Sequence, residues 1–161
     1  MSREAQVRPM EPGDLDAVAA IESALYPNPW HREHFAELLD LPAGIAWVAV
    51  EGDGTVSGYG VGWAAADEGE IANLAVTPER RRRGTGARIL EALLREAAKR
   101  GARRAWLEVR ASNEPAQVLY ARHGFRVIGR RRGYYLRPRE DALVMAAELA
   151  VPSVDPAHGS P

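Results

Sequence analysis

The spacing of hydrophobic residues along the chain changes several times, and each change marks a boundary between a predicted strand and a predicted helix. Residues 84–100 predict the clearest helix, because their apolar side chains recur on one helical face. That face comprises Ile89, Leu90, Leu93, Leu94 and Ala97. Further helices are predicted at 14–25, 31–40 and 114–122. Strands are predicted at 5–9, 45–50, 55–65, 69–76, 103–110, 125–131 and 141–149.

The order of these elements predicts a single α/β domain over residues 1–150. The strand–helix–strand unit at 69–110 is a crossover, so its two strands should run parallel. The turn signal at residues 51–54 and the other short connections predict antiparallel hairpins. We therefore expect a mixed, mostly antiparallel sheet with helices on both faces. Residues 132–140 are predicted to form a loop, and residues 151–161, with three prolines and a glycine, a disordered tail.

Composition excludes several classes of protein. The chain has 161 residues and no cysteine, which excludes disulfide scaffolds, thiol nucleophiles and metal sites built on cysteine. No apolar run approaches the ~20 residues that a membrane span needs. The first residues lead into no apolar segment of the kind found in secretion signals. A cytoplasmic protein without a membrane partner is expected.

Charge is distributed unevenly, although the net charge is only −1. Residues 80–139 hold 17 arginines and one lysine against four acids, a net charge of +14, and the rest of the chain carries −15. The basic segment should therefore attract anions, and the remainder should repel them. Arginine supplies 20 of the 21 basic residues, and Lys99 is the single lysine.

The densest basic run, Arg80 to Arg83, lies between a predicted strand that ends at Val76 and the helix that begins at residue 84. A helix N-terminus already carries about half a positive charge, and no acid follows within this helix before Glu91. Unless it is only a solvated basic loop, this arrangement calls for a bound anion. Free N–H groups and two glycines at the helix start favour a phosphate group. The Lys-Ser/Thr pair of a P-loop is missing, so nucleotide hydrolysis is not indicated.

A nucleic-acid binding module that uses the basic 80–139 stretch is an alternative from a different class. Such a module predicts aromatic residues interleaved with the basic run, and residues 80–88 contain none. Direct binding of nucleic acid is therefore not expected.

Several motifs extend from this loop along the chain. Arg81-x-x-Gly84-x-Gly86 follows the strand Asn73-Leu74-Ala75-Val76, and it resembles motif A of the GNAT N-acetyltransferases. The resemblance continues through Leu107 to Asn113, Ala116 to Tyr120, Gly124-Phe125, Gly133 to Tyr135 and Glu140 to Met145. This extended set is similar to the RimI branch of the family, the ribosomal-protein-alanine N-acetyltransferases. The match covers about residues 5–149.

The resemblance implies the GNAT fold, in which the one parallel strand pair is splayed, and acetyl-CoA as co-substrate. The pyrophosphate of acetyl-CoA would lie against backbone amides of the basic loop, with the pantetheine beside the preceding strand. The residues implied to bind it are Leu74, Ala75, Val76, Arg81, Arg82, Arg83, Gly84, Thr85, Gly86, Ala87 and Asn113. Asn113 is also predicted to cap the helix at 114–122, and the two roles are compatible.

Acetyl transfer to an amine requires a neutral amine, a stabilised oxyanion and a proton for the leaving thiolate. The resemblance assigns Glu108 as the general base and Tyr120 as the general acid, and a backbone N–H near Val76 would face the oxyanion. Without the resemblance, Glu108 is interpreted as a surface strand residue and Tyr120 as a core aromatic.

The substrate implied by the RimI branch is the N-terminus of a small-subunit ribosomal protein that begins with alanine. It would enter between Pro29-Trp30 and Tyr134-Tyr135. A GNAT enzyme that acetylates lysine side chains or a small amine is the nearest alternative, and a catalytically inactive cofactor sensor is a further one. His31 and His34 share a helix face but lack a third ligand, so no metal is expected.

Overall fold

The computed structural model describes residues 4–150, so the predicted tail at 151–161 lies outside the described residues. The strands are β1 (Gln6–Pro9), β2 (Gly44–Val50), β3 (Val56–Ala65), β4 (Glu68–Val76), β5 (Arg104–Arg110), β6 (Arg126–Leu136) and β7 (Arg139–Glu148). The helices are α1 (Leu15–Leu25), α2 (Arg32–Asp40), α3 (Thr85–Lys99) and α4 (Glu114–Arg122). Two short 3-10 helices, η1 (Pro12–Asp14) and η2 (Pro78–Arg80), complete the order.

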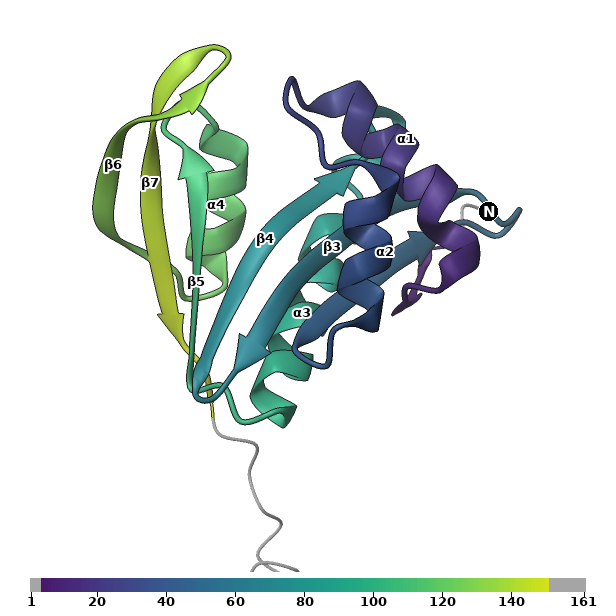
Figure 1. Cartoon of the computed structure of the whole chain (residues 1–161), viewed down its shortest axis with the longest axis horizontal. Coiled ribbons are helices and arrows are strands. Elements are labelled where there is room, and N and C mark those ends of the chain that lie inside the picture. The colour runs from purple at the N-terminus through teal and green to yellow at the C-terminus, as the bar shows by residue number, and fades with distance from the viewer. Residues whose placement is uncertain (1–3, 151–161) are drawn as a thin grey trace, which may run out of the picture.

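The strands form one seven-stranded sheet in the order β1-β2-β3-β4-β5-β7-β6. Every neighbouring pair is antiparallel except β4 and β5, which are parallel, as the crossover through α3 predicts. Helices α1 and α2 cover one face of β2 and β3, while α3 packs on the other face (Figure 1). The mixed sheet with helices on both faces is therefore confirmed.

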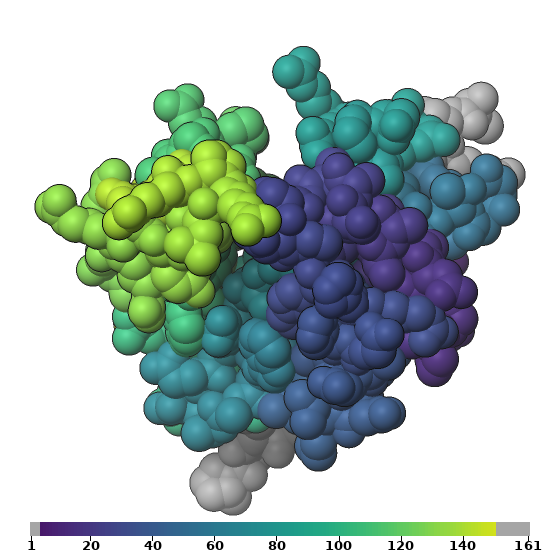
Figure 2. All heavy atoms as spheres, turned by 45° about the horizontal axis from the view of Figure 1, so that its top comes forward, coloured from purple at the N-terminus to yellow at the C-terminus, as the bar shows by residue number. Residues whose placement is uncertain are grey.

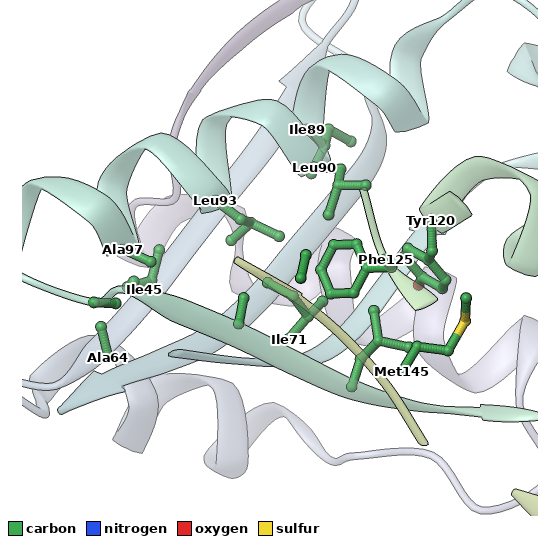
Figure 3. Packing of buried hydrophobic residues seen from close by; sticks show 14 of the residues in the cluster. Ile45, Ala64, Ile71, Ile89, Leu90, Leu93, Ala97, Tyr120, Phe125 and Met145 are labelled. Carbon is green, nitrogen blue, oxygen red and sulfur yellow. The ribbon is translucent and has the colours of Figure 1, made fainter. Parts of the chain in front are cut away.

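Helix α3 carries the larger of two hydrophobic clusters. Its residues Ile89, Leu90 and Leu93 are at most 1% exposed, as the helical stripe predicts. They face the side chains of Tyr120 and Phe125 across the core (Figure 3). Tyr120 comes from α4, so this helix lies on the same face of the sheet as α3. The second cluster lies beneath α1 and α2 and contains Val18, Phe35, Val48, Tyr59 and Val61.

The parallel pair separates partway along its length. Strand β4 pairs with β5 only from Glu68 to Ile71, and the partner of Ile71 is Leu107. The next residue, Ala72, has no partner in β3 either, because the register shifts between the pairs Val61–Asn73 and Gly62–Ile71. An extra residue in one strand bends it and increases its local twist. The bulge and the separation therefore coincide, and the β5-facing edge of residues 72–76 has no strand partner (Figure 1).

The prediction that residues 132–140 form a loop is wrong. Strand β6 reaches Leu136 and β7 begins at Arg139, so only Arg137 and Pro138 connect them. Tyr134 and Tyr135 have side chains that favour strands, and the pairs Tyr135–Glu140 and Leu136–Arg139 extend β6 beyond Gly133. Pairing is irregular between Arg131 and Tyr135, where Gly133 has a φ of 59°.

The described residues 4–150 contain no helix that is both long enough and apolar enough to span a membrane.

Gly62 lies where the bulge brings β4 close to β3. A Cβ atom at this position would fall well inside contact distance of the backbone oxygen of Glu70, which cannot move without disrupting the sheet. We expect Gly62→Ala to lower the free energy of unfolding by about 1–3 kcal/mol, as overpacking does. Urea unfolding measures this change. The control Gly52→Ala, with no atom within 4 Å of the new Cβ, should change it by less than about 0.5 kcal/mol. Equal stability of the two variants would contradict the steric argument.

Candidate functional site

Two cavities meet where β4 and β5 separate. The larger, about 630 Å³, lies beside the basic loop and the start of α3. The smaller, about 210 Å³, lies between the α1–α2 connection and the β6–β7 side of the sheet. Five residues line both cavities: Tyr26, Leu74, Asn113, Ala116 and Tyr120. The gap in the sheet therefore joins one cavity to the other.

The larger cavity is built to receive an anion. Arg82 and Gly84 have φ values of 66° and 77°, a left-handed conformation that turns the backbone into a concave loop ahead of α3. Gly84 is the N-cap of this helix, no side chain caps its first turn, and that turn contains no acid. The first backbone N–H groups of α3 are thus free for a ligand.

Most of the residues predicted to bind the cofactor line this cavity. They are Leu74, Ala75, Val76, Arg81, Arg82, Gly84, Thr85, Gly86, Ala87 and Asn113. Arg83, the remaining predicted residue, is not part of the lining. The lining also includes Arg122, the last residue of α4, and Arg80. The sequence contains no signal that separates Arg122 from other surface arginines, because its place depends on how α4 packs.

The arginines of the loop differ in what they contact. The side-chain nitrogen Nε of Arg81 donates to the carbonyl oxygen of Val76 at 3.1 Å, which fixes the loop to the end of β4. Arg80 lies 3.6 Å from a carboxylate oxygen of Glu51. Within residues 4–150, no ion pair involves Arg82 or Arg122. These two guanidinium groups remain available to a bound phosphate.

Glu108 lies on the floor of the smaller cavity, and residues of β6 hold both of its oxygens. The hydroxyl of Tyr134 donates to Oε1 at 3.1 Å. Nε of Arg131 forms an ion pair with Oε2 at 2.6 Å. The side chain of Glu108 is only 13% exposed. Burial, together with the charge of Glu108, raises the pKa of Tyr134, so this tyrosine remains a donor at neutral pH.

The irregular part of β6 is what directs Tyr134 toward Glu108. Asp141 of β7 accepts from the backbone N–H of Gly133 at 2.8 Å and from Nε of Arg130 at 2.6 Å. These contacts hold the bulge, and a bulge re-aims the side chains next to it. Tyr135 then lines the cavity directly, and burial together with Glu108 raises the pKa of Tyr135 to about 12.

Tyr120 stands at the junction of the two cavities. Its ring packs 5.7 Å from the ring of Phe125, and the residue is 8% exposed. Burial raises the pKa of its hydroxyl well above the ordinary value, so the group keeps its proton at neutral pH. Tyr120 is therefore both a core aromatic and a protonated phenol that faces the gap between the strands.

The other residues predicted to bind substrate are only partly in the cavity lining. Trp30 lines it, together with Pro27 and Asn28 of the same connection, but Pro29 does not. In the space-filling view, the yellow part of the β6–β7 hairpin meets the indigo segment between α1 and α2, with teal β4 recessed between them (Figure 2).

His31 and His34 cap the start of α2, where the backbone N–H of His31 donates to Nδ1 of His34 at 3.0 Å.

Glu22 was not singled out from the sequence, yet it organises the wall of the smaller cavity. It is 1% exposed and accepts a hydrogen bond from the hydroxyl of Tyr59. Nδ2 of Asn73 donates to both oxygens of Glu22, to Oε1 at 3.0 Å and to Oε2 at 2.9 Å. It also accepts from the backbone N–H of Trp30 at 3.0 Å. A signal for it exists, because Glu22 falls on the same helical face as Leu15 and Val18, where a carboxylate needs partners.

Tyr26 also lines both cavities and closes the junction from the α1 side. Its hydroxyl donates to the carbonyl oxygen of Leu74 at 3.2 Å, on the unpaired edge of β4. Burial, with the charge of Glu22, raises the pKa of Tyr26 to about 12. Taken together, the site offers an anion cradle on one side, a carboxylate on the other and a protonated phenol between them.

Comparison with known proteins agrees with this arrangement. The family model described as the Acetyltransferase (GNAT) family matches residues 15–125. A candidate ribosomal protein bS18-alanine N-acetyltransferase of Bacillus subtilis is 38% identical over 146 residues, which are 90% of this chain and 96% of that protein. The ribosomal protein bS18-alanine N-acetyltransferase of Escherichia coli K12 is 35% identical over 146 residues, 88% of this chain and 96% of its own.

Among proteins of known structure, an enzyme with a similar name to these relatives has a similar fold to this chain. The crystal structure of the ribosomal-protein-S18-alanine N-acetyltransferase from Escherichia coli superposes with a TM-score of 0.82 at 33% identity, over 93% of this chain and 97% of that one. The match of the family model, the identities of the relatives and the splayed parallel strand pair lead to one assignment. This chain is an acetyltransferase that belongs to the GNAT family.

Proposed function

We propose that this enzyme transfers the acetyl group of acetyl-CoA to the α-amino group of a protein, and that its natural substrate is a small-subunit ribosomal protein that begins with alanine. The names of the relatives support the substrate. The observation that carries the chemistry is the pair of cavities joined at Tyr120. A donor and an acceptor can enter from opposite sides of the sheet and meet within reach of the same residues.

The larger cavity fits acetyl-CoA. Its free N–H groups at the start of α3, together with Arg82 and Arg122, suit a pyrophosphate. The unpaired edge of β4 at residues 72–76 suits an extended chain with amide groups, because it offers backbone partners as another strand would. When bound, acetyl-CoA supplies a thioester, which is the activated acyl group.

The reaction needs two proton transfers, and a different residue at the junction of the two cavities carries out each one. The amine nitrogen forms a bond to the thioester carbonyl carbon, and the carbon–sulfur bond breaks. Glu108 accepts the proton that the amine loses, directly or through one water. Tyr120 donates a proton to the leaving sulfur, since burial keeps its hydroxyl protonated. Arg131 and Tyr134 hold the carboxylate of Glu108 in place during this step.

An α-amine is the acceptor that this base can serve near neutral pH. Its pKa of about 7.7–8.0 leaves a useful fraction neutral, whereas a lysine side chain at about 10.4 is almost entirely charged. The deciding experiment compares two peptides with acetyl-CoA: one begins with a free alanine and contains no lysine, and the other is blocked at its N-terminus and contains one lysine. We expect acetylation of the first alone, read by mass spectrometry. Equal acetylation of the blocked peptide would overturn the α-amine assignment in favour of lysine.

Gly86 tests the location of acetyl-CoA. A Cβ at this position would lie 3.6 Å from Leu119 and 3.7 Å from Val76, which are ordinary contacts, so Gly86→Ala should bind normally. Gly86→Glu places a longer, negative side chain in the cavity, and we expect acetyl-CoA affinity to fall about 100-fold or more. Calorimetry on the folded variants measures both. Unchanged affinity of Gly86→Glu would place acetyl-CoA elsewhere.

Glu108→Gln tests the general base. The amide cannot accept the proton, so we expect kcat/KM for the peptide to fall about 100-fold near pH 7 while the Kd for acetyl-CoA stays the same. The loss should shrink as the pH rises toward 9, because a larger fraction of the α-amine is then already neutral. The exposed residue Glu68 provides the control Glu68→Gln, which should match the parent enzyme. Full activity of Glu108→Gln at pH 7 would make Glu108 a structural residue.

Tyr120→Phe tests the general acid. The ring still packs against Phe125, so the thermal midpoint and the Kd for acetyl-CoA should stay close to those of the parent. Only the hydroxyl proton is lost, and we expect kcat to fall by about 100-fold. Steady-state kinetics with the alanine peptide measures this fall. A phenylalanine variant with full turnover would assign the proton to water.

A further inference from the structure

A third cavity, about 250 Å³, adjoins the smaller cavity of the candidate site but is not part of it. It is lined by Trp30, His34, Glu37, Leu38, Leu41 and Trp63. Its walls are therefore two indole rings and two leucine side chains, with two polar groups beside them. Leu41, at the end of α2, is 48% exposed, so an apolar side chain faces solvent beside this cavity.

Trp30 connects this cavity to the candidate site, because it lines both. Its position is fixed from several sides. Glu22 holds its backbone N–H, its ring centroid lies 5.2 Å from that of Phe35, and the ring of Trp63 is 5.9 Å away. The connection between α1 and α2 thus forms a wall shared by the two cavities, and these contacts hold it in place. Of the residues that line the third cavity, only Trp30 also lines the smaller one, so the two adjoin at this residue.

We propose that the third cavity binds an apolar side chain of the substrate peptide, a few residues after its acetylated N-terminus. This inference rests on the proposed function. An α-amine at Glu108 places the rest of the peptide outside the smaller cavity, where an extended chain advances about 3.3–3.6 Å per residue. The side chains of Trp63, Leu38 and Leu41 offer that chain an apolar surface already held in position. The substrate class is therefore a protein N-terminus with a leucine, methionine or aromatic residue shortly after its first residue.

The experiment uses a host peptide that begins with alanine and continues with serine and glycine, together with variants that carry one phenylalanine at each of the next five positions. We expect one position to raise kcat/KM about tenfold or more over the host peptide, the discrimination that a preformed apolar pocket gives. The gain should come from KM, because this cavity lies away from Glu108 and Tyr120.

Two enzyme variants locate the gain. Leu41→Ser and Trp63→Ala should abolish the preference for phenylalanine. Leu41→Ser should leave kcat/KM on the host peptide unchanged, whereas Trp63→Ala should also lower it, because the ring of Trp63 packs against Trp30 of the candidate site. Val118→Ser is the matched control, because Val118 is 49% exposed on α4 and lines none of the three cavities. Leu41→Ser changes one half-exposed side chain, so it keeps the test valid if Trp63→Ala unfolds.

Each result decides a different question. Acetylation of the host peptide without a gain at any position would overturn the subsite and leave the proposed function intact. A gain that survives in Leu41→Ser would also overturn it. A concentration-dependent dimer of the parent enzyme that Leu41→Ser dissociates and Val118→Ser does not would assign the cavity to a second copy of the chain. Absence of acetylation on every peptide, with acetyl-CoA bound, would overturn the proposed function itself.

Discussion

The separation of two parallel strands is the feature on which the rest of this molecule depends. Strands β4 and β5 begin as ordinary neighbours, and their pairing ends at Ile71, beside the extra residue Ala72. Beyond that point the sheet is open between its two halves. Backbone groups that would bond to a neighbouring strand are left facing the gap, and an unpaired buried backbone group is unfavourable unless it finds a partner. Tyr26 and Arg81 satisfy two of the carbonyl groups on this edge.

The walls of the opening are held by carboxylates rather than by apolar packing alone. Glu22 ties the α1–α2 connection to β3 and β4, and Asp141 ties the irregular part of β6 to β7. A hydrogen bond to a charged acceptor stabilises by about 1.5–3 kcal/mol, more than one between neutral groups. Glu108 is likewise held by polar contacts, an ion pair with Arg131 and a hydrogen bond from Tyr134. Polar contacts of this kind fix the direction of side chains, which a hydrophobic surface does not.

The sequence predicts the parts of the fold that follow from local pattern. The apolar stripe of α3, the parallel crossover and the mixed sheet are confirmed, because each depends on spacing within one segment or on the order of segments. The loop predicted at 132–140 is wrong, because the strand there depends on pairing between Tyr135 and Glu140 across a hairpin. Glu22 was missed for a related reason: its partners lie on β3, on β4 and at Trp30, and no local spacing brings them together.

The candidate site also has parts that the sequence predicts and parts that depend on contacts between distant segments. Glu108 and Tyr120 lie at the cavities as the family resemblance implies, and their roles as base and acid stay predictions. The resemblance places them by position in a motif, not by their surroundings. Arg131 and Arg122 carry no such signal, since they are two of many arginines in a basic segment. The contact of Arg131 depends on the bulge in β6, and the place of Arg122 in the cavity depends on the packing of α4. Neither feature is visible in the sequence.

The choice of arginine for the loop before α3 has a consequence for the enzyme's own integrity. A thioester can acylate an amine, so a lysine in the cavity that we propose for acetyl-CoA would be a possible acceptor as well as a ligand. A guanidinium keeps its charge at every physiological pH and is a far poorer nucleophile, so the lining residues Arg80, Arg81 and Arg82 suit the proposed donor without being acceptors of its acyl group. Lys99, the single lysine of the chain, is in the last turn of α3, about 21 Å along the helix from Thr85. The cavity proposed for the acyl donor is therefore lined by basic side chains that resist acylation.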